Sequence, residues 1–300
     1  MSALSSLQGV HLPVTTPFAG AGGVDASAFG SNLDAFLAHP IAGLVIAGST
    51  GEAPLLSDDE LFMLVEQAAV RIGERSLIVG TGAESTRRVI ATSRAAADRG
   101  ATAVLVRAPY YFAPAMSHAV LTDYWTAVAD ASPVPVILYH IPKFVPVDVT
   151  PELVGQLTEH PNIVGIKDST GTMDSLRGFI GACGSNASVL VGSGALLLDA
   201  LEAGAVGGIL GSAVVAPGVA SELYAAWRDG DPDRARGLQG VLGPLHVSIV
   251  VGCGNPGVKA ALDRLGLYGG PPRPPLPPVD ADRAAAVDAA LEAAGLAASV

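Results

Sequence analysis

The sequence predicts an α/β fold of the (β/α)₈ barrel class, also called a TIM barrel, with a helical extension at its C-terminal end. Eight short apolar segments recur along the chain at intervals of roughly 25 to 35 residues. Each is a continuous hydrophobic run, which is typical of parallel strands buried on both faces. Helical patterns lie between them, and this alternation favours a closed barrel. The alternative is an open doubly wound sheet, but no G-x-G-x-x-G motif follows the first strand, which weakens its dinucleotide-binding version.

The expected strands lie in the first two thirds of the chain. They are residues 10–18, 41–47, 77–82, 103–109, 134–140, 163–168, 189–194 and 207–214. The active site of such a barrel lies at the C-terminal ends of its strands. Polar residues that directly follow these segments are therefore the candidate functional residues.

Helix boundary signals separate the strands. Ser57 and Glu60 have the spacing of a capping box before an apolar face. Ser117 and Thr150 are expected N-caps, because their hydroxyls can accept a hydrogen bond from the first helical turn. Gly100 is expected to end a helix.

The pattern changes after Pro217. Helices are expected over residues 221–228, 232–242, 256–265 and 281–294, with a proline-rich connector over residues 269–278. We therefore expect a catalytic barrel over residues 1–216 and a helical region over residues 217–300 that packs on it.

Composition argues against several classes of function. Half of the 300 residues are hydrophobic and 15% are charged, which permits a sizeable core. The net charge of −11 and the lack of a basic run argue against a nucleic-acid partner. No apolar run reaches the about 18 uninterrupted residues of a membrane span, and no signal-peptide pattern opens the chain. The two cysteines are expected to be free thiols in a reducing cytoplasm.

Lys167 is the most informative residue. It is one of only three lysines, with Lys143 and Lys259, and it ends an apolar run that is followed at once by turn residues. Partial desolvation lowers the pKa of a lysine, and the neutral amine attacks a carbonyl carbon to form a Schiff base. The alternative is an ordinary lysine at a strand end that reaches solvent.

Three other strand ends carry groups suited to the same chemistry. The turn over residues 48–52 can offer backbone amides and the hydroxyls of Ser49 and Thr50 to a carboxylate. Tyr139 is a candidate acid/base, although a buried tyrosine is more often a core residue. Tyr111 is more often a packing or interface residue. His140 is expected to point away from Tyr139, because successive residues of a strand face opposite sides.

The order and spacing of these motifs resemble those of the dihydrodipicolinate synthase / N-acetylneuraminate lyase family of class I aldolases. The matching segments span nearly the whole chain, and they are residues 13–18, 48–52, 109–111, 139–142, 165–168, 192–194, 258–262 and 273–276. The resemblance implies a (β/α)₈ barrel with a helical C-terminal region that forms a homotetramer, a dimer of dimers. It implies imine chemistry with no cofactor and no metal.

The resemblance also assigns roles to single residues. Lys167 matches the lysine that forms a Schiff base with pyruvate or a longer 2-oxo acid, and Tyr139 matches the general acid/base. Ser49 and Thr50, with Gly51 beside them, match the residues that hold the carboxylate of the 2-oxo acid.

Two further positions match the family. Tyr111 corresponds to a tyrosine that a neighbouring subunit donates to complete the Tyr139–Ser49 proton relay. Ile209 corresponds to a position on the eighth strand whose backbone carbonyl lies near the lysine.

One position departs from the family's synthases. Phe144 stands where they keep an arginine that binds the distal carboxylate of the aldehyde, and Lys143 is out of register by one residue. The motif over residues 167–170 looks more like that of 2-keto-3-deoxy sugar-acid and 4-hydroxy-2-oxoglutarate aldolases. We therefore expect a class I carbon–carbon or carbon–oxygen lyase that acts on pyruvate or a longer 2-oxo acid of that type, with an aldehyde as the second reactant. Lys259 is expected on a helix surface.

Four alternatives stay open. The chain could be a 4-hydroxy-tetrahydrodipicolinate synthase, or a dehydratase of a deoxy-keto sugar acid. A non-catalytic 2-oxo-acid binding protein would keep Ser49 and Thr50 but would not need Lys167 or Tyr139. A metal-dependent aldolase or hydrolase is disfavoured, because the six histidines are scattered and no H-x-H pair occurs.

Overall fold

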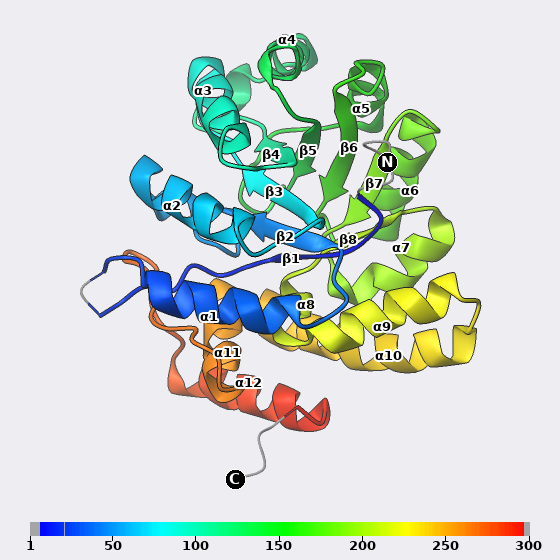
Figure 1. Cartoon of the computed structure of the whole chain (residues 1–300). Coiled ribbons are helices and arrows are strands. Elements are labelled where there is room, and N and C mark those ends of the chain that lie inside the picture. The colour runs from blue at the N-terminus through cyan, green and yellow to red at the C-terminus, as the bar shows by residue number, and fades with distance from the viewer. Residues whose placement is uncertain (1–6, 21, 297–300) are drawn as a thin grey trace.

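The computed structural model describes residues 7–20 and 22–296, and its centre is a closed barrel of eight parallel strands (Figure 1). Each strand pairs with its neighbour in sequence, and β8 pairs with β1. The strands are β1 (Gly9–Pro13), β2 (Gly43–Ile46), β3 (Ser76–Gly80), β4 (Ala103–Arg107), β5 (Val136–His140), β6 (Ile163–Asp168), β7 (Ser188–Val191) and β8 (Gly207–Ile209). The predicted fold class is confirmed.

The first and last strands are shorter than predicted. β1 ends at Pro13, although residues 14–18 stay buried. β8 ends at Ile209, and the chain then forms helix α8 (Gly211–Val215). The expected strand over residues 210–214 was therefore wrong, because a fully buried apolar run has the same pattern in a strand and in a helix.

Seven helices follow the first seven strands and surround the barrel (Figure 1). Ser57 and Glu60 form the predicted capping box, and the hydroxyls of Ser117 and Thr150 cap the helices that follow them. Gly100 lies just beyond its helix with a φ of 100°, a left-handed conformation that glycine adopts without strain. The helices are α1 (Ala26–Leu37), α2 (Asp58–Ala69), α3 (Thr86–Ala97), α4 (His118–Ala131), α5 (Pro151–Leu157), α6 (Met173–Cys183) and α7 (Leu197–Ala203).

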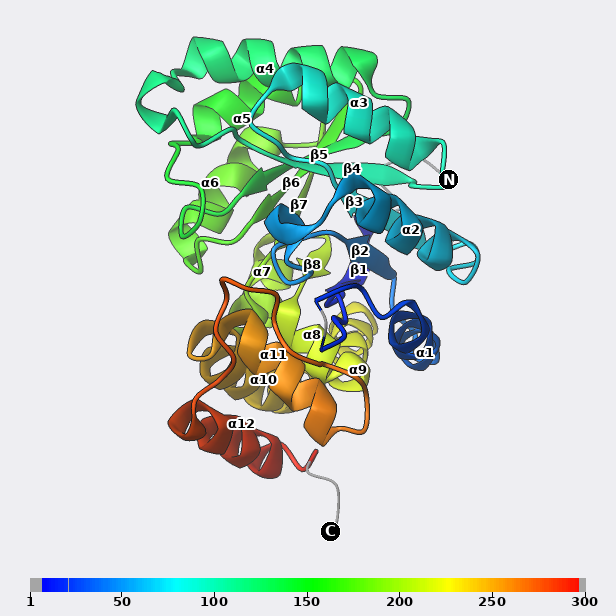
Figure 2. The ribbon, with the colours of Figure 1, turned by 90° about the vertical axis from the view of Figure 1, so that its left-hand side faces the viewer.

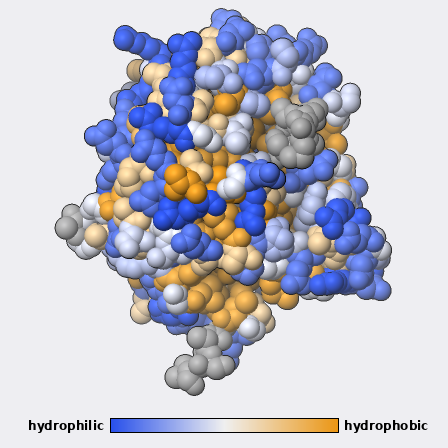
Figure 3. Space-filling view, in the orientation of Figure 1, coloured by the Kyte–Doolittle hydropathy of each residue, from blue (hydrophilic) through white to orange (hydrophobic). Residues whose placement is uncertain are grey.

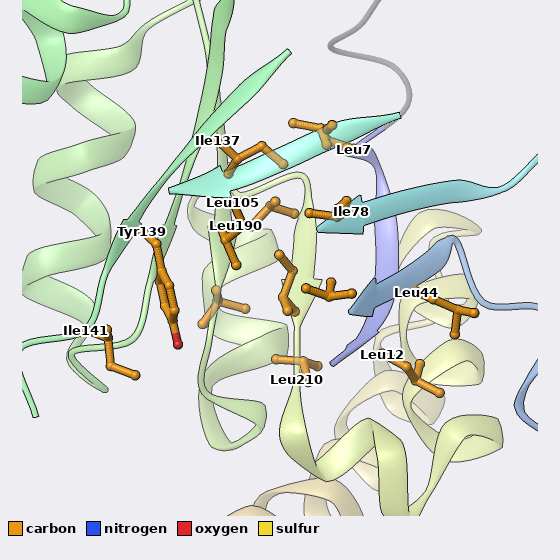
Figure 4. Packing of buried hydrophobic residues seen from close by; sticks show 14 of the residues in the cluster. Leu7, Leu12, Leu44, Ile78, Leu105, Ile137, Tyr139, Ile141, Leu190 and Leu210 are labelled. Carbon is orange, nitrogen blue, oxygen red and sulfur yellow. The ribbon is translucent and has the colours of Figure 1, made fainter. Parts of the chain in front are cut away.

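Strand register determines which side chains fill the barrel. Leu105 pairs with Ile137, and Tyr139 pairs with Lys167, so these four residues share the inner face of the sheet. Figure 4 shows Leu105 and Ile137 inside the ring of strands, with Tyr139 further along the same face of β5. The apolar interior thus ends in a polar layer at the C-terminal ends of the strands.

The C-terminal region lies along one side of the barrel, next to β1 and β8 (Figures 1 and 2). It contains α9 (Pro217–Arg228), α10 (Pro232–Leu245), the π-helix η5 (His246–Val251), α11 (Gly254–Arg264) and α12 (Ala281–Ala293). The four predicted helices are present, and the π-helix was not predicted. Since α9 packs directly on β1, the domain boundary at residue 216 stays a prediction.

None of the helices within the described residues is long and apolar enough to cross a membrane. Figure 3 shows polar and apolar residues mixed over the face that it displays.

Candidate active site

Lys167 and Tyr139 lie side by side on neighbouring strands inside the barrel. They are register partners on β6 and β5, and only 5% and 7% of their surfaces are exposed. The Lys167 Nζ atom lies 4.4 Å from the centre of the Tyr139 ring. A primary amine and a phenol are therefore held in contact where solvent is largely excluded.

Local packing explains how β6 carries the lysine to this place. Gly165 stands two residues earlier on the same face, and a Cβ atom there would lie 2.6 Å from the carbonyl oxygen of Ser188. Glycine therefore lets β6 and β7 approach closely below the lysine.

The outer faces of the same strands are tied together by His140 and Asp168. His140 Nδ1 lies 3.1 Å from Asp168 Oδ1, and the imidazole packs edge-on against Phe179 of α6. The Thr170 hydroxyl donates to Asp168 Oδ2 at 2.8 Å. The prediction that His140 points away from Tyr139 is confirmed, and this pair holds the ends of β5 and β6 together.

Ser49 joins the pair from the turn after β2. Its hydroxyl oxygen lies 3.3 Å from the Tyr139 hydroxyl oxygen, within hydrogen-bond distance. The two hydroxyls can therefore pass a proton between them.

The turn itself has an unusual backbone. Ala47 and Glu52 bracket it with φ angles of 53° and 57°, a left-handed conformation that costs a non-glycine residue roughly 1–2 kcal/mol. The amides of Gly51 and Glu52 donate within the turn, to the carbonyl oxygens of Gly48 and Ser49.

The amides of Ser49 and Thr50 donate to no protein acceptor within the described residues. Adjacent free N–H groups have the geometry to bind an anion such as a carboxylate. The far side of the turn is anchored, because Thr16 Oγ1 donates to the Gly51 carbonyl at 2.6 Å and Asn255 Nδ2 donates to the Ser49 carbonyl at 2.5 Å.

Ile209 is the last residue of β8. It is 1% exposed and pairs with His11 of β1. A Cβ atom at Gly211 would lie 3.8 Å from Thr50 Oγ1, so the first residue of α8, two positions after Ile209, approaches the hydroxyl of Thr50.

Lys259 corrects an expectation. The sequence suggested a helix-surface lysine, but 1% of it is exposed, and its Nζ atom lies 2.7 Å from Glu52 Oε1 and donates to the Pro271 carbonyl at 2.8 Å. Burial lowers the pKa of Lys259, and the bond from Glu52 opposes that shift. Because α11 packs under the turn, this lysine faces a carboxylate that is distant in sequence, and it is closed to substrate.

Tyr111 lies away from the cluster in a single chain. It is 75% exposed, and its neighbour Phe112 is 67% exposed. The amides of Tyr110 and Tyr111 donate to Glu84 Oε2 at 2.9 and 2.8 Å, and Arg107 lies 2.9 Å from Glu84 Oε1. Burial raises the pKa of Glu84, but these amide bonds and Arg107 outweigh it and lower the pKa. The loop is thus fixed with Tyr111 facing outward.

A cavity of about 320 Å³ opens beside Ser49 and Tyr139. Phe144 lies on its wall, and Lys143 Nζ lies 5.6 Å from the centre of the Phe144 ring. Phe144 is 52% exposed, so it forms part of the rim.

Several residues that line this cavity were not predicted as site residues from the sequence, among them Arg107, Asn255 and Leu276. Arg107 was detectable as a charge within the apolar run predicted over residues 103–109, and it is the last residue of β4. Asn255 and Leu276 reach the cavity only because the C-terminal region folds back over it.

Within the described residues, no group of three or more His, Cys, Asp or Glu side chains is arranged to hold a metal ion. The donors at the site are instead an amine, hydroxyls and amides, which suit covalent carbonyl chemistry.

Comparison with known proteins agrees with this arrangement. The Dihydrodipicolinate synthetase family matches residues 6–294. This chain belongs to that family. It is 38% identical to a 4-hydroxy-tetrahydrodipicolinate synthase of Chelativorans sp. (strain BNC1), and the match covers 94% of this chain and 97% of the relative. Family membership makes the chain a lyase with the expected barrel.

Two solved structures are similar over nearly the whole chain. YagE, a prophage protein of the dihydrodipicolinic acid synthase family from E. coli K12, was solved with pyruvate; it has a TM-score of 0.91, 30% identity and coverage of 97% of this chain and 99% of its own. A dihydrodipicolinate synthase from Acinetobacter baumannii, also with pyruvate, has a TM-score of 0.91, 32% identity and the same coverage. Similar chains of this fold therefore accept a 2-oxo acid.

Proposed function

We propose that this chain is a Schiff-base-forming lyase that joins pyruvate to an aldehyde, or cleaves the product of that addition. Lys167 attacks the keto carbon and water leaves, which gives a protonated imine. The imine withdraws electrons, so a proton leaves C3 and an enamine forms. The enamine carbon attacks the aldehyde carbon, and the aldehyde oxygen takes up a proton. Water then hydrolyses the new imine, which releases the product and frees Lys167. Cleavage follows the same steps in reverse.

The contact between Lys167, Tyr139 and Ser49 carries this proposal. Tyr139 is placed to move protons at the imine, and Ser49 is within reach of its hydroxyl. The free amides of Ser49 and Thr50, with Gly51 shaping the turn, offer two donors to the substrate carboxylate. Ile209 ends β8, and its role near the lysine stays part of the proposal.

The identity of the aldehyde that reacts with pyruvate is a separate part of the proposal. The curated relatives favour 4-hydroxy-tetrahydrodipicolinate synthesis over the sugar-acid type of substrate expected from the sequence. Phe144 favours that sugar-acid type as the second candidate, because a phenyl ring offers no charge-assisted hydrogen bond to a distal carboxylate. Lys143 lies close enough to supply a charge in its place.

A panel of aldehydes tests the choice. If synthesis of the dihydrodipicolinate precursor is the reaction, pyruvate and aspartate semialdehyde should react with a kcat/KM of roughly 10⁴ M⁻¹s⁻¹ or more. Lys143→Ala should then lower that value, and Phe144→Arg should raise it or leave it unchanged. Poor turnover of the semialdehyde, together with good turnover of hydroxylated or apolar 2-oxo acids, would select the second candidate.

Assembly, compartment and metal independence belong to the same proposal. The exposed Tyr111–Phe112 pair supports a tight dimer within a homotetramer. The free thiols of Cys183 and Cys253 support a cytoplasmic location. Metal independence predicts that turnover survives dialysis against a chelator, and loss of turnover that zinc or magnesium restores would contradict it.

A further inference from the structure

A buried ion pair lies directly beneath the turn over residues 48–52, which is called the carboxylate-binding turn below. Glu52 ends the turn, and 0% of its side chain is exposed; 1% of the Lys259 side chain is exposed. Glu52 Oε1 lies 2.7 Å from Lys259 Nζ, and Oε2 accepts from the Arg273 amide at 2.9 Å. A pair so fully removed from water gives no large net stability by itself, so its position calls for another explanation.

The ammonium group of Lys259 has two further contacts besides the Glu52 carboxylate. It donates to the Pro271 carbonyl at 2.8 Å and lies 4.4 Å from the centre of the Phe18 ring. The Arg273 guanidinium lies 4.1 Å from the same ring. The lysine is thus a fixed point to which the Glu52 carboxylate is tied.

The same helix contacts the turn twice. Asn255 and Lys259 are four residues apart on α11, so both face the turn. Asn255 Nδ2 holds the Ser49 carbonyl at 2.5 Å, at the start of the turn, while Lys259 holds Glu52 at its end. Between these two anchors lie the free amides of Ser49 and Thr50.

The left-handed backbone of Glu52 is a reason for a second anchor. Its φ of 57° is unfavourable for a residue with a Cβ, and such a conformation persists only where the surrounding contacts hold it. Binding groups have to be held within roughly 0.5 Å of their working positions. Release of Glu52 would let the turn relax and would misdirect both amides.

We propose that the Glu52–Lys259 ion pair is a positioning device that sets the carboxylate-binding turn, so that the C-terminal helical region controls the affinity of the barrel for 2-oxo acids. This inference rests on the proposed function. Neither side chain reaches substrate, since both side chains are closed to solvent.

The experiment compares a ketone that has a carboxylate with one that has none. Borohydride trapping on Lys167 is measured against the concentration of pyruvate and, separately, of acetone. Lys259→Met keeps the length of the side chain and removes its charge. The half-saturating pyruvate concentration should rise about tenfold or more, as expected for the loss of one hydrogen bond to a charged group. Trapping by acetone should stay at the wild-type level, whereas simple unfolding would lower both.

The matched control is Arg264→Met. Arg264 lies on the same helix and pairs with Asp288 at 2.8 Å, but this pair is about half exposed and lies on the side toward α12. This variant should trap both ketones like the wild type. Unchanged pyruvate dependence in Lys259→Met would overturn the positioning role, and so would an equal loss with both ketones in a variant that circular dichroism shows to be folded. Absence of pyruvate labelling on Lys167 in the wild type would instead contradict the proposed function.

A second variant covers a failure to fold. Lys259→Met leaves a buried carboxylate unpaired, which is strongly destabilising. Glu52→Gln/Lys259→Met removes both charges, and the glutamine oxygen can still accept from the Arg273 amide. The ratio of the half-saturating acetone concentration to the half-saturating pyruvate concentration should be about tenfold smaller in this double variant than in the wild type, because the ion pair that anchors Glu52 to α11 is gone. A wild-type preference would overturn the proposal.

Discussion

Lys167 and Tyr139 show how side-chain burial and strand register combine to make a reactive pair. Register places both on the inner face of the barrel, and the apolar layer below them excludes water. The Tyr139 hydroxyl can then exchange protons with Ser49 and with the reacting nitrogen without competition from bulk solvent.

Tyr139→Phe separates the nucleophile from the acid/base. Turnover should fall by roughly 10²-fold or more, because proton transfer loses its positioned group. Borohydride trapping on Lys167 should be slower but still detectable, because the amine is intact. Steady-state kinetics and trapping rates measure the two effects, and wild-type turnover in this variant would remove Tyr139 from the mechanism.

His246 is a second buried titratable group, and it acts on stability. It begins the π-helix η5, and its Nδ1 accepts from the Gly194 amide at 3.2 Å. Burial lowers the pKa of His246 from 6.5 to about 4. The unfolded chain therefore binds a proton below pH 6.5 while the folded protein does not until about pH 4, so stability falls as the pH drops through this window.

His246→Asn tests this linkage. Asparagine can still accept from the Gly194 amide but does not titrate. Between pH 7.5 and pH 5, the wild type should lose about 2 kcal/mol of unfolding free energy through this residue, and the variant should lose correspondingly less. Urea denaturation at both pH values measures the difference, and parallel pH profiles would contradict the assignment.

Single strands and helices differed in how well the sequence predicted them. The strands β2 to β7 were found because continuous apolar runs between helix caps are typical of a buried parallel sheet. The apolar run after Gly207 was predicted as one strand, but β8 ends at Ile209 and the equally buried helix α8 follows. The π-helix was not predicted, since a short π-helix is a local departure from the helical period that the hydrophobic pattern follows.

The candidate site was predictable for a related reason. Ser49, Tyr139 and Lys167 follow or end predicted strands, so the barrel prediction placed them at one edge of the sheet. Their roles were assigned by the family resemblance and stay predictions. The partner of Lys259 was not predictable, because the pairing with Glu52 depends on how α11 docks under the turn after β2. Helical periodicity shows which residues share a face but not which distant residue meets that face.

The protein as a whole is expected to complete its site by assembly. Tyr111 is exposed on a loop that Glu84 fixes, so we expect its side chain to contact a neighbouring subunit. If Tyr111 serves a neighbour's Tyr139, Tyr111→Phe and Lys167→Ala subunits are each inactive alone. Mixing them should restore part of the activity, because some hybrid interfaces contain one complete site.

Subunit exchange has to be verified in that experiment, for example by native mass spectrometry of differently tagged chains. Activity that stays absent in proven hybrids would argue against a shared site. Full activity of Tyr111→Phe alone would exclude the relay through Tyr111.

Imine formation on Lys167 is the step on which the whole account depends. Pyruvate and borohydride together should add the mass of a reduced pyruvyl imine, and peptide mapping should place it on Lys167. Lys143 and Lys259 should stay unlabelled, since Lys143 lies on the rim and Lys259 is closed to solvent. Lys167→Ala should be neither labelled nor active. Labelling of another lysine, or full turnover in Lys167→Ala, would contradict the account.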